Sequence, residues 1–158
     1  MTGADARVTG SDSPASDREI RPLSVAEIAT DAFRRLLWRA AEVDDDALKA
    51  IVTDELPALT VLGTVEAGEV SGFVAFDDRG DVVVIEYIAV SEAATGGGRG
   101  RALVDAIHAH VGEKALFAQT DDDAVDFYRR VGFAVSAAGE ADPRWPDRRR
   151  YDCLLSAR

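Results

Sequence analysis

The sequence predicts one α/β (α+β) domain. Short runs of β-branched residues, typical of buried strands, alternate with longer segments that carry apolar residues at helical spacing. Strand-to-helix junctions at 82–107 and 115–131 give the clearest examples of this alternation. A chain of 158 residues suffices for one core, with about 70% of its unfolded surface buried on folding.

Composition limits the partners of the protein. The net charge of −11 argues against nucleic acids and anionic membranes as partners. No apolar run approaches the roughly 20 residues of a membrane span. Cys153 is the only cysteine, so an intramolecular disulfide is excluded and a cytoplasmic location is the simplest expectation. Residues 1–19 lack an apolar signal core and are rich in small and polar residues, so we expect a disordered tail before a single domain over 20–158.

The first half of the domain shows a strand, two helical segments and a hairpin. Ile20–Leu23 is typical of a short strand. Ser24 begins a helix with the capping-box spacing to Glu27, and its apolar face continues through Ile28, Phe33, Leu36 and Leu37. Asp44–Leu56 is a second helical segment. A hairpin follows, with strands over 59–65 and 70–76 and its turn at Ala67 and Gly68. The later elements are expected at 82–90 (strand), from 102 (helix), 115–118 (strand), 121–131 (helix), 133–137 (strand) and 151–155 (strand).

A glycine-rich segment follows the strand Val82–Val90. Its glycines are Gly96, Gly97, Gly98 and Gly100. Residues without a Cβ atom allow the backbone to approach a ligand closely. The following helix offers unpaired N–H groups and the positive end of its dipole. Arg99 and Arg101 add cationic donors suited to phosphate oxygens. The segment therefore predicts a site for a phosphorylated ligand.

Two common nucleotide motifs do not fit this segment. A Walker loop needs Gly-Lys followed by Ser or Thr, and no lysine occurs between Ala50 and Glu113. A dinucleotide fingerprint needs another glycine three residues after Gly100, where Leu103 stands.

The segment instead resembles the acetyl-CoA loop of the GNAT superfamily of N-acetyltransferases. In that family a strand-ending Val precedes Arg or Gln, two residues, Gly, one residue, and Gly or Ala ahead of a helix. Val90, Gly98 and Gly100 match these positions, and Leu103 matches the apolar start of the helix. Thr95 stands where the family has Arg or Gln.

A second segment, 121–133, resembles another motif of the same family. That motif has Asn, two residues and Ala, then an apolar-Tyr pair and a Gly-Phe ending. The matching positions are Ala124, Tyr128, Gly132 and Phe133. Asp121 replaces the usual Asn.

The resemblance covers residues 20–156 and implies a mixed central β-sheet flanked by about four helices. It implies acetyl-CoA as co-substrate and no metal. The expected cofactor-binding residues are Ile88, Ala89, Val90, Thr95, Gly96, Gly97, Gly98, Arg99, Gly100, Arg101, Asp121, Ala124 and Tyr128.

Two residues are expected to carry the chemistry. Tyr128 matches the position of the general acid in many family members, and a phenol can donate a proton or hydrogen bond to a departing thiolate. The alternative is a core aromatic. Glu86 interrupts an apolar strand, where a partly buried carboxylate could accept the proton of an amine. The alternative is a solvent-facing Glu86 or one paired with an arginine.

Other polar and aromatic residues are assigned structural roles. His108 and His110 point to different helix faces, which disfavours a metal site. Cys153 is expected as a small buried residue. Core packing is favoured for Trp38, and loop cover for Trp145, over stacking against a substrate.

Two functions follow from these observations. The first is an N-acetyltransferase that transfers acetyl directly from acetyl-CoA to a primary amine of a small molecule or peptide. The alternative is a non-catalytic acyl-CoA-binding module for sensing or interaction, which Thr95 and Asp121 keep open. The expected partners are acetyl-CoA and an amine acceptor, and a homodimer is considered as the assembly. The acceptor would depend on the 24–56 helices and the 139–149 loop.

Overall fold

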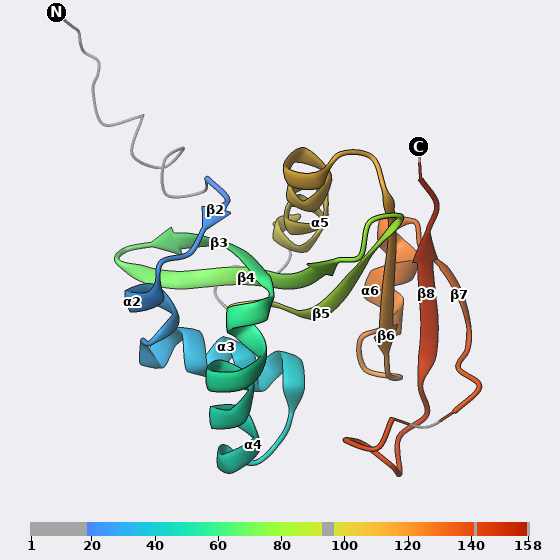
Figure 1. The fold of residues 1–158 in the computed structure, drawn as a ribbon, viewed down its shortest axis with the longest axis horizontal. Helices are drawn as coiled ribbons and strands as arrows, with labels where there is room; N and C mark the ends of the chain where they lie inside the picture. The colour runs from blue at the N-terminus through green and yellow to red at the C-terminus, as the bar shows by residue number, and fades with distance from the viewer. Residues whose placement is uncertain (1–18, 93–96, 141, 158) are drawn as a thin grey trace, which may run out of the picture.

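The protein is a seven-stranded mixed sheet with helices on both faces (Figure 1). The computed structural model describes residues 19–92, 97–140 and 142–157. The strand order is β2-β3-β4-β5-β6-β8-β7. All neighbouring strands pair antiparallel except β5 and β6, which are parallel. The mixed sheet flanked by helices agrees with the expectation from sequence.

The elements have the following bounds. The strands are β2 (Arg21–Pro22), β3 (Thr60–Glu66), β4 (Glu69–Asp78), β5 (Val82–Val90), β6 (Ala115–Thr120), β7 (Ala134–Ala137) and β8 (Tyr151–Leu155). The α-helices are α2 (Val25–Ile28), α3 (Asp31–Ala41), α4 (Asp45–Ala50), α5 (Arg99–Val111) and α6 (Val125–Val131). A π-helical turn, η1 (Ile51–Glu55), and a 3-10 turn, η2 (Leu56–Ala58), follow α4. Of the helices in these described ranges, none has both the length and the apolar character needed to cross a membrane.

The helix expected from Ser24 is divided into α2 and α3. Its predicted capping box is present, because the Ser24 side chain accepts from the Glu27 N–H and the Glu27 carboxylate accepts from the Ser24 N–H. Thr30 then caps α3 by accepting from the Phe33 N–H at 3.2 Å. The second cap is the physical reason for the break. The continuous helix expected there is therefore corrected to two shorter ones.

Two apolar cores lie on the two faces of the sheet. One joins α3 and α4 to the sheet and contains Phe33 and Phe73, whose ring centroids are 4.6 Å apart. The other joins α5 and α6 to the opposite face and contains Ile107, Leu116 and Tyr128. Figure 1 shows these helix pairs on opposite sides of the strands.

Glu86 is an extra residue in β5. Ala75 of β4 pairs with Tyr87 and Phe76 pairs with Ile85, so Glu86 has no partner on β4. This bulge reverses the alternation of side chains along the strand. Ile85 faces the core beneath α5, whereas Tyr87, two residues later, faces the core beneath α3.

Beyond the bulge, β5 and β6 separate. Their parallel pairing runs from Val82 with Ala115 to Ile85 with Ala118 and then stops. The last residues of β5, 87–90, pair only with β4. Backbone groups on the β6 side of this segment are therefore available to a ligand.

Candidate functional site

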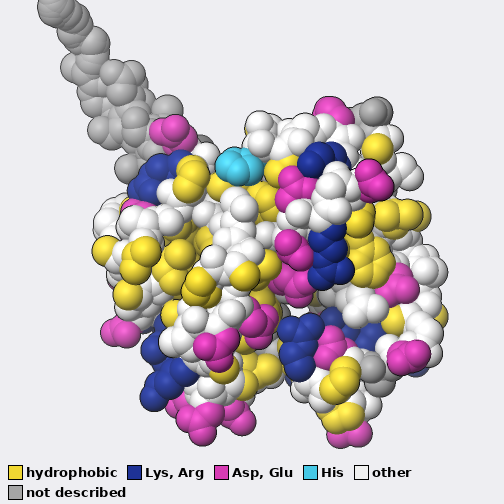
Figure 2. Space-filling model, in the orientation of Figure 1, with side chains coloured by type: hydrophobic (Ala, Val, Ile, Leu, Met, Phe, Trp, Pro, Cys, Tyr) yellow, Lys and Arg dark blue, Asp and Glu magenta, His cyan; other side chains and the backbone are white. Residues whose placement is uncertain are grey.

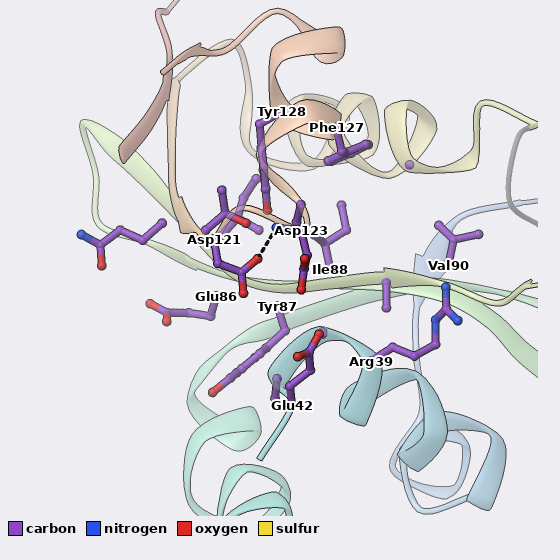
Figure 3. A pocket seen from close by; sticks show the side chains of 18 of the residues that line it. Arg39, Glu42, Glu86, Tyr87, Ile88, Val90, Asp121, Asp123, Phe127 and Tyr128 are labelled. Atoms are coloured by element: carbon purple, nitrogen blue, oxygen red, sulfur yellow. Dashed lines mark hydrogen bonds between the residues drawn. The ribbon is translucent and has the colours of Figure 1, made fainter. Parts of the chain in front are cut away.

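A cavity of about 1150 Å³ lies where β5 and β6 separate. It is bordered by the end of β5, the beginnings of α5 and α6, the end of α3 and the loop before β8. Figure 2 shows the molecular surface hollowed between the α3–α4 side and the C-terminal part of the chain, with basic side chains beside the hollow. Figure 3 shows the side chains inside it. The cavity therefore joins both segments that the sequence analysis singled out.

The N-terminus of α5 forms one end of the cavity. Gly98 is the residue before the helix and has a left-handed backbone with φ of 76°. A Cβ atom there would contact nothing within 4 Å, so glycine is favoured by backbone conformation rather than by space. The N–H groups of the first helical turn lack helical acceptors and are suited to bind an anion. The end of β5, with Ile88, Ala89 and Val90, lines the same cavity.

Gly100 has a different reason to be glycine. A Cβ atom at this position would lie 2.5 Å from Cε1 of the Phe127 ring in α6. Because the first turn of α5 packs against α6 at this point, any side chain would displace the ring. Gly100 thus keeps the two helices that border the cavity close together.

The two arginines of the glycine segment are held by protein groups. Arg99, at the start of α5, forms a two-point ion pair with Glu66 at the end of β3. Arg101 donates a hydrogen bond of 2.9 Å to the carbonyl oxygen of Arg130 in α6. Both residues still line the cavity. That either guanidinium binds a phosphate stays a prediction. Each arginine would have to share its N–H donors between the phosphate and its present protein partner.

Tyr128 points from α6 into the cavity, toward the separated part of β5 (Figure 3). Its ring is buried beside Phe133, with centroids 5.2 Å apart. No hydrogen-bond partner of its hydroxyl is found among the residues that the structure describes. Burial raises the pKa of this phenol, and the neighbouring Cys153 thiol adds to the increase. Tyr128 therefore keeps its proton near neutral pH and can donate it in a hydrogen bond.

Glu86 lines the cavity from the bulge of β5. Its side chain is 24% exposed, and Arg79 Nη2 lies 3.9 Å from its Oε2. Burial raises the pKa of Glu86, while the positive charges of Arg144 and Arg79 oppose the increase. A carboxylate of this kind can accept a proton from an amine. The structure also contains the pairing of Glu86 with an arginine that was considered as the alternative, in the form of this weak contact with Arg79.

Tyr87 carries a network that sequence analysis missed. The Tyr87 hydroxyl donates to Glu55 Oε1 at 2.7 Å and accepts from Arg144 Nη1 at 3.1 Å. Burial and the bond to Glu55 raise the pKa of this phenol. Arg144 also forms an ion pair with Asp142. Tyr87 faces away from Tyr128, across β5 (Figure 3). Only the bulge at Glu86 explains this placement, since regular alternation would put Tyr87 on the other face.

The approach to α6 holds Asp121 and Ala124 at the cavity. The Asp121 carboxylate accepts from the Asp123 N–H at 3.0 Å and from Arg148 Nη1 at 2.9 Å. Arg148 also pairs with Glu42 at the end of α3, at 2.8 Å. One arginine in the loop before β8 thus connects the two halves of the cavity wall.

The loop before β8 covers the cavity, as expected for Trp145. Its indole N–H donates to the Ala41 carbonyl oxygen at 2.9 Å, and its ring lies under the guanidinium groups of Arg144 and Arg150. The expectation that Trp38 packs in the core is wrong. Trp38 is 53% exposed and lines the cavity, because α3 ends there and leaves its outer face uncovered.

Comparisons with known proteins agree with this architecture. The model of the acetyltransferase (GNAT) family matches residues 24–133. This chain belongs to the GNAT acetyltransferase family. The match includes β5, the start of α5 and α6, and so contains both motifs that suggested the resemblance.

Solved structures share the GNAT fold at low sequence identity. A Bacillus subtilis acetyltransferase in complex with CoA is 20% identical, with a TM-score of 0.65 over 89% of this chain and 99% of that one. The ribosomal-protein-S18-alanine N-acetyltransferase of Escherichia coli is 16% identical, with a TM-score of 0.65 over 87% and 92%. A GNAT acetyltransferase of Elizabethkingia anophelis with acetyl-CoA bound is 18% identical, with a TM-score of 0.61 over 89% and 97%. No curated protein sequence matches this one.

The cavity is lined by most of the site residues expected from sequence. Those at the cavity are Glu86, Ile88, Ala89, Val90, Gly98, Arg99, Gly100, Arg101, Asp121, Ala124 and Tyr128. Gly97 is exposed and lies outside the lining, while Thr95 and Gly96 fall outside the described residues. The expected tail also lies outside them, apart from Glu19.

Cys153 lies on β8 and is fully buried in this GNAT domain. Burial raises the pKa of its thiol to about 11, so it is a neutral thiol near neutral pH. The expectation of a small buried residue is confirmed. Within the described ranges, no group of three His, Cys, Asp or Glu side chains is arranged to hold a metal ion.

Arg150 is a second residue that sequence analysis missed. It lies just before β8, is 8% exposed and lines the cavity. The run of three arginines at 148–150 is the only local signal, and it does not distinguish the buried member from its neighbours. Arg149, the middle one, is exposed and donates to the Tyr151 hydroxyl.

Proposed function

We propose that this GNAT protein transfers an acetyl group directly from acetyl-CoA to a primary amine of a small molecule or peptide. The single observation that carries the proposal is the free hydroxyl of Tyr128 in the gap between β5 and β6. A buried phenol whose hydroxyl has no hydrogen-bond partner among the described residues fits a donor for a leaving thiolate. Membership of the acetyltransferase family supports the same reaction.

The cavity residues fit the co-substrate. The N–H groups at the start of α5 would bind the pyrophosphate, with Arg99 and Arg101 beside them. Unpaired backbone groups of β5 beyond Ile85 would hydrogen-bond the remainder of the molecule. Acetyl-CoA would supply the activated acetyl group and leave as the thiol.

The proton transfers assign roles to two side chains. Glu86, directly or through water, would take a proton from the acceptor ammonium, leaving a nucleophilic amine. A nitrogen–carbon bond to the acetyl group then forms and the carbon–sulfur bond breaks. Tyr128 would donate a hydrogen bond or proton to the departing sulfur. The attacking nitrogen then loses a second proton, which through water replaces the proton that Tyr128 gave to sulfur. The net reaction converts the ammonium and acetyl-CoA into the amide, the CoA thiol and one released proton.

Thiol release from acetyl-CoA across a panel of primary amines tests this function. We expect amine-dependent thiol release with formation of the acetylated amine. Binding of acetyl-CoA without thiol release for any amine would instead support the non-catalytic sensing module. We further propose a cytoplasmic protein on the basis of its single cysteine, with sedimentation of the purified chain to test for a homodimer.

A further inference from the structure

Arg150 is a buried cation whose guanidinium has no hydrogen-bond or ion-pair partner among the described residues. Its side chain lies at the cavity, and its Nε atom is enclosed without a hydrogen bond. Within the described residues the guanidinium forms no hydrogen bond and no ion pair. Burial lowers the pKa of this guanidinium, which reflects the cost of removing its charge from water. Because a guanidinium has five N–H donors, a residue kept in this state is suited to a ligand that supplies the missing acceptors.

The carboxylates near Arg150 are committed to other arginines. Asp142 pairs with Arg144 at 2.9 Å, and Asp121 pairs with Arg148 at 2.9 Å. Both carboxylates act on Arg150 only at longer range. Among the described residues, Arg144 and Arg148 therefore have carboxylate partners, whereas Arg150 has none.

Trp145 holds Arg150 in place without using its donors. The guanidinium carbon lies 4.7 Å from the centre of the indole ring. This cation–π contact positions the planar group without using its N–H donors, so the terminal Nη groups remain for a ligand in the cavity. The Trp145 indole is itself tied to α3 by its bond to the Ala41 carbonyl oxygen.

We propose that the acceptor carries a carboxylate group and that Arg150 binds it, so that the acceptor is an amino acid or a similar amino carboxylate. This inference rests on the proposed acetyl transfer. Glu86 and Arg150 line the same cavity, which thus offers a base to the amine and a cation to the acid of one molecule. A planar guanidinium matches a carboxylate at two points. The net charge of −11 repels anions in general, so recognition of one needs such a local cation.

The first experiment compares matched acceptors with the purified full chain and acetyl-CoA. The standard amino acids are each tested beside their carboxamides and their decarboxylated amines, with phosphoethanolamine added as a phosphate-bearing amine. We expect the preferred amino acid to exceed its carboxamide in kcat/KM by about 10- to 100-fold, the range for a hydrogen bond to a charged group. Equal rates for the acid and the amide, or a preference for phosphoethanolamine, would overturn the proposal.

The second experiment uses variants of Arg150. Arg150→Gln should lower kcat/KM for the amino acid by about 10- to 100-fold and leave the carboxamide unchanged. Arg150→Lys should restore part of the loss, since it keeps the charge without the planar fork. Arg149→Gln, the exposed neighbour, should match the parent. An equal loss for the acid and the amide would assign Arg150 to acetyl transfer or packing and would contradict carboxylate binding.

Direct binding separates this proposal from the proposed function. Isothermal titration of the CoA-bound protein with the same amino acids and amides requires no turnover. Carboxylate-dependent binding without any thiol release would reject acetyl transfer while supporting the role of Arg150. Thiol release with simple amines, together with no preference for acids in either measurement, would reject the role of Arg150 alone. Should Arg150→Gln fail to fold, the comparison of the parent with Arg150→Lys decides.

Discussion

Gly100 of α5 faces the ring of Phe127 in α6 so closely that a Cβ atom would lie 2.5 Å from the ring edge. The next residue along α6 is Tyr128, whose hydroxyl lies in the gap between β5 and β6 (Figure 3). The close approach of the two helices therefore places the proposed proton donor near the proposed anion site. The second glycine of the motif is required by helix packing, whether or not its backbone also meets a phosphate.

Gly100→Ala should lower the free energy of unfolding by about 1–3 kcal/mol, because the new methyl group displaces the Phe127 ring. Phe127→Leu removes the ring atoms in question, so the double variant should recover part of the loss. Urea denaturation of the single and double variants measures both effects. Gly98→Ala is the matched control. It costs about 1–2 kcal/mol through its positive φ, and Phe127→Leu should not restore it. If the losses of unfolding free energy in Gly100→Ala and Phe127→Leu simply add in the double variant, the proposed contact with the ring is contradicted.

Tyr128→Phe should lower kcat by about 100- to 10,000-fold, the range for loss of an acid–base group. Affinity for acetyl-CoA should change little, because the ring that packs in the core remains. Initial rates and calorimetry measure the two quantities separately. Tyr151→Phe serves as control, since that hydroxyl bonds to Asp122 away from the cavity. Parental turnover in Tyr128→Phe would make Tyr128 a structural aromatic.

Glu86 should determine the acidic limb of the rate–pH profile. A base must be deprotonated, so the rate falls as the pH drops through its pKa. Burial raises that pKa, so the limb should lie above the range of an ordinary glutamate, about pH 4.3. Glu86→Gln should lower the rate and flatten the limb, whereas Asp81→Asn, in the turn before β5, should leave the profile unchanged. An unaltered limb in Glu86→Gln would transfer the role to solvent or another group.

Removing either member of the ion pair between Arg99 and Glu66 should change the affinity for CoA, and the two changes should have opposite signs. Arg99→Ala removes a cation at the start of α5 and should weaken CoA and dephospho-CoA alike, by less than about tenfold because Glu66 already offsets part of the charge. Glu66→Gln removes the offset and should strengthen both. Calorimetry at low salt gives the two affinities. A selective loss for CoA would place Arg99 at the 3′-phosphate, and no change in either variant would remove the pair from the site.

Local sequence patterns predicted the parts of the fold that depend on neighbouring residues. The bounds of β5 and β8 agree with expectation, since each is a short apolar run between turn residues. The turn at Ala67 and Gly68 was also correct. Both residues have positive φ, as a tight hairpin turn requires. The sequence does contain a signal for the break before α3, because Thr30 followed by Asp31 is typical of the start of a new helix.

The remaining features depend on contacts between distant segments. The bulge at Glu86 exists only in the register of β5 against β4, and so does the placement of Tyr87. The pairing of β5 with β6, which stops at Ile85, is likewise a contact between segments distant in sequence. Burial of Arg150 follows from the docking of the 138–150 loop onto the end of α3, through Trp145 and Arg148. The sequence pattern within a single segment does not indicate which distant segment it will contact.

The insertion of β8 between β6 and β7 has a consequence for biosynthesis. As the chain leaves the ribosome, β6, α6 and β7 emerge before the strand that must join β6 to β7. Cys153, which packs in the core around Tyr128, belongs to that last strand. Tyr128 therefore acquires its final surroundings only after β8 has emerged, and a nascent chain stalled before residue 151 holds an incomplete cavity.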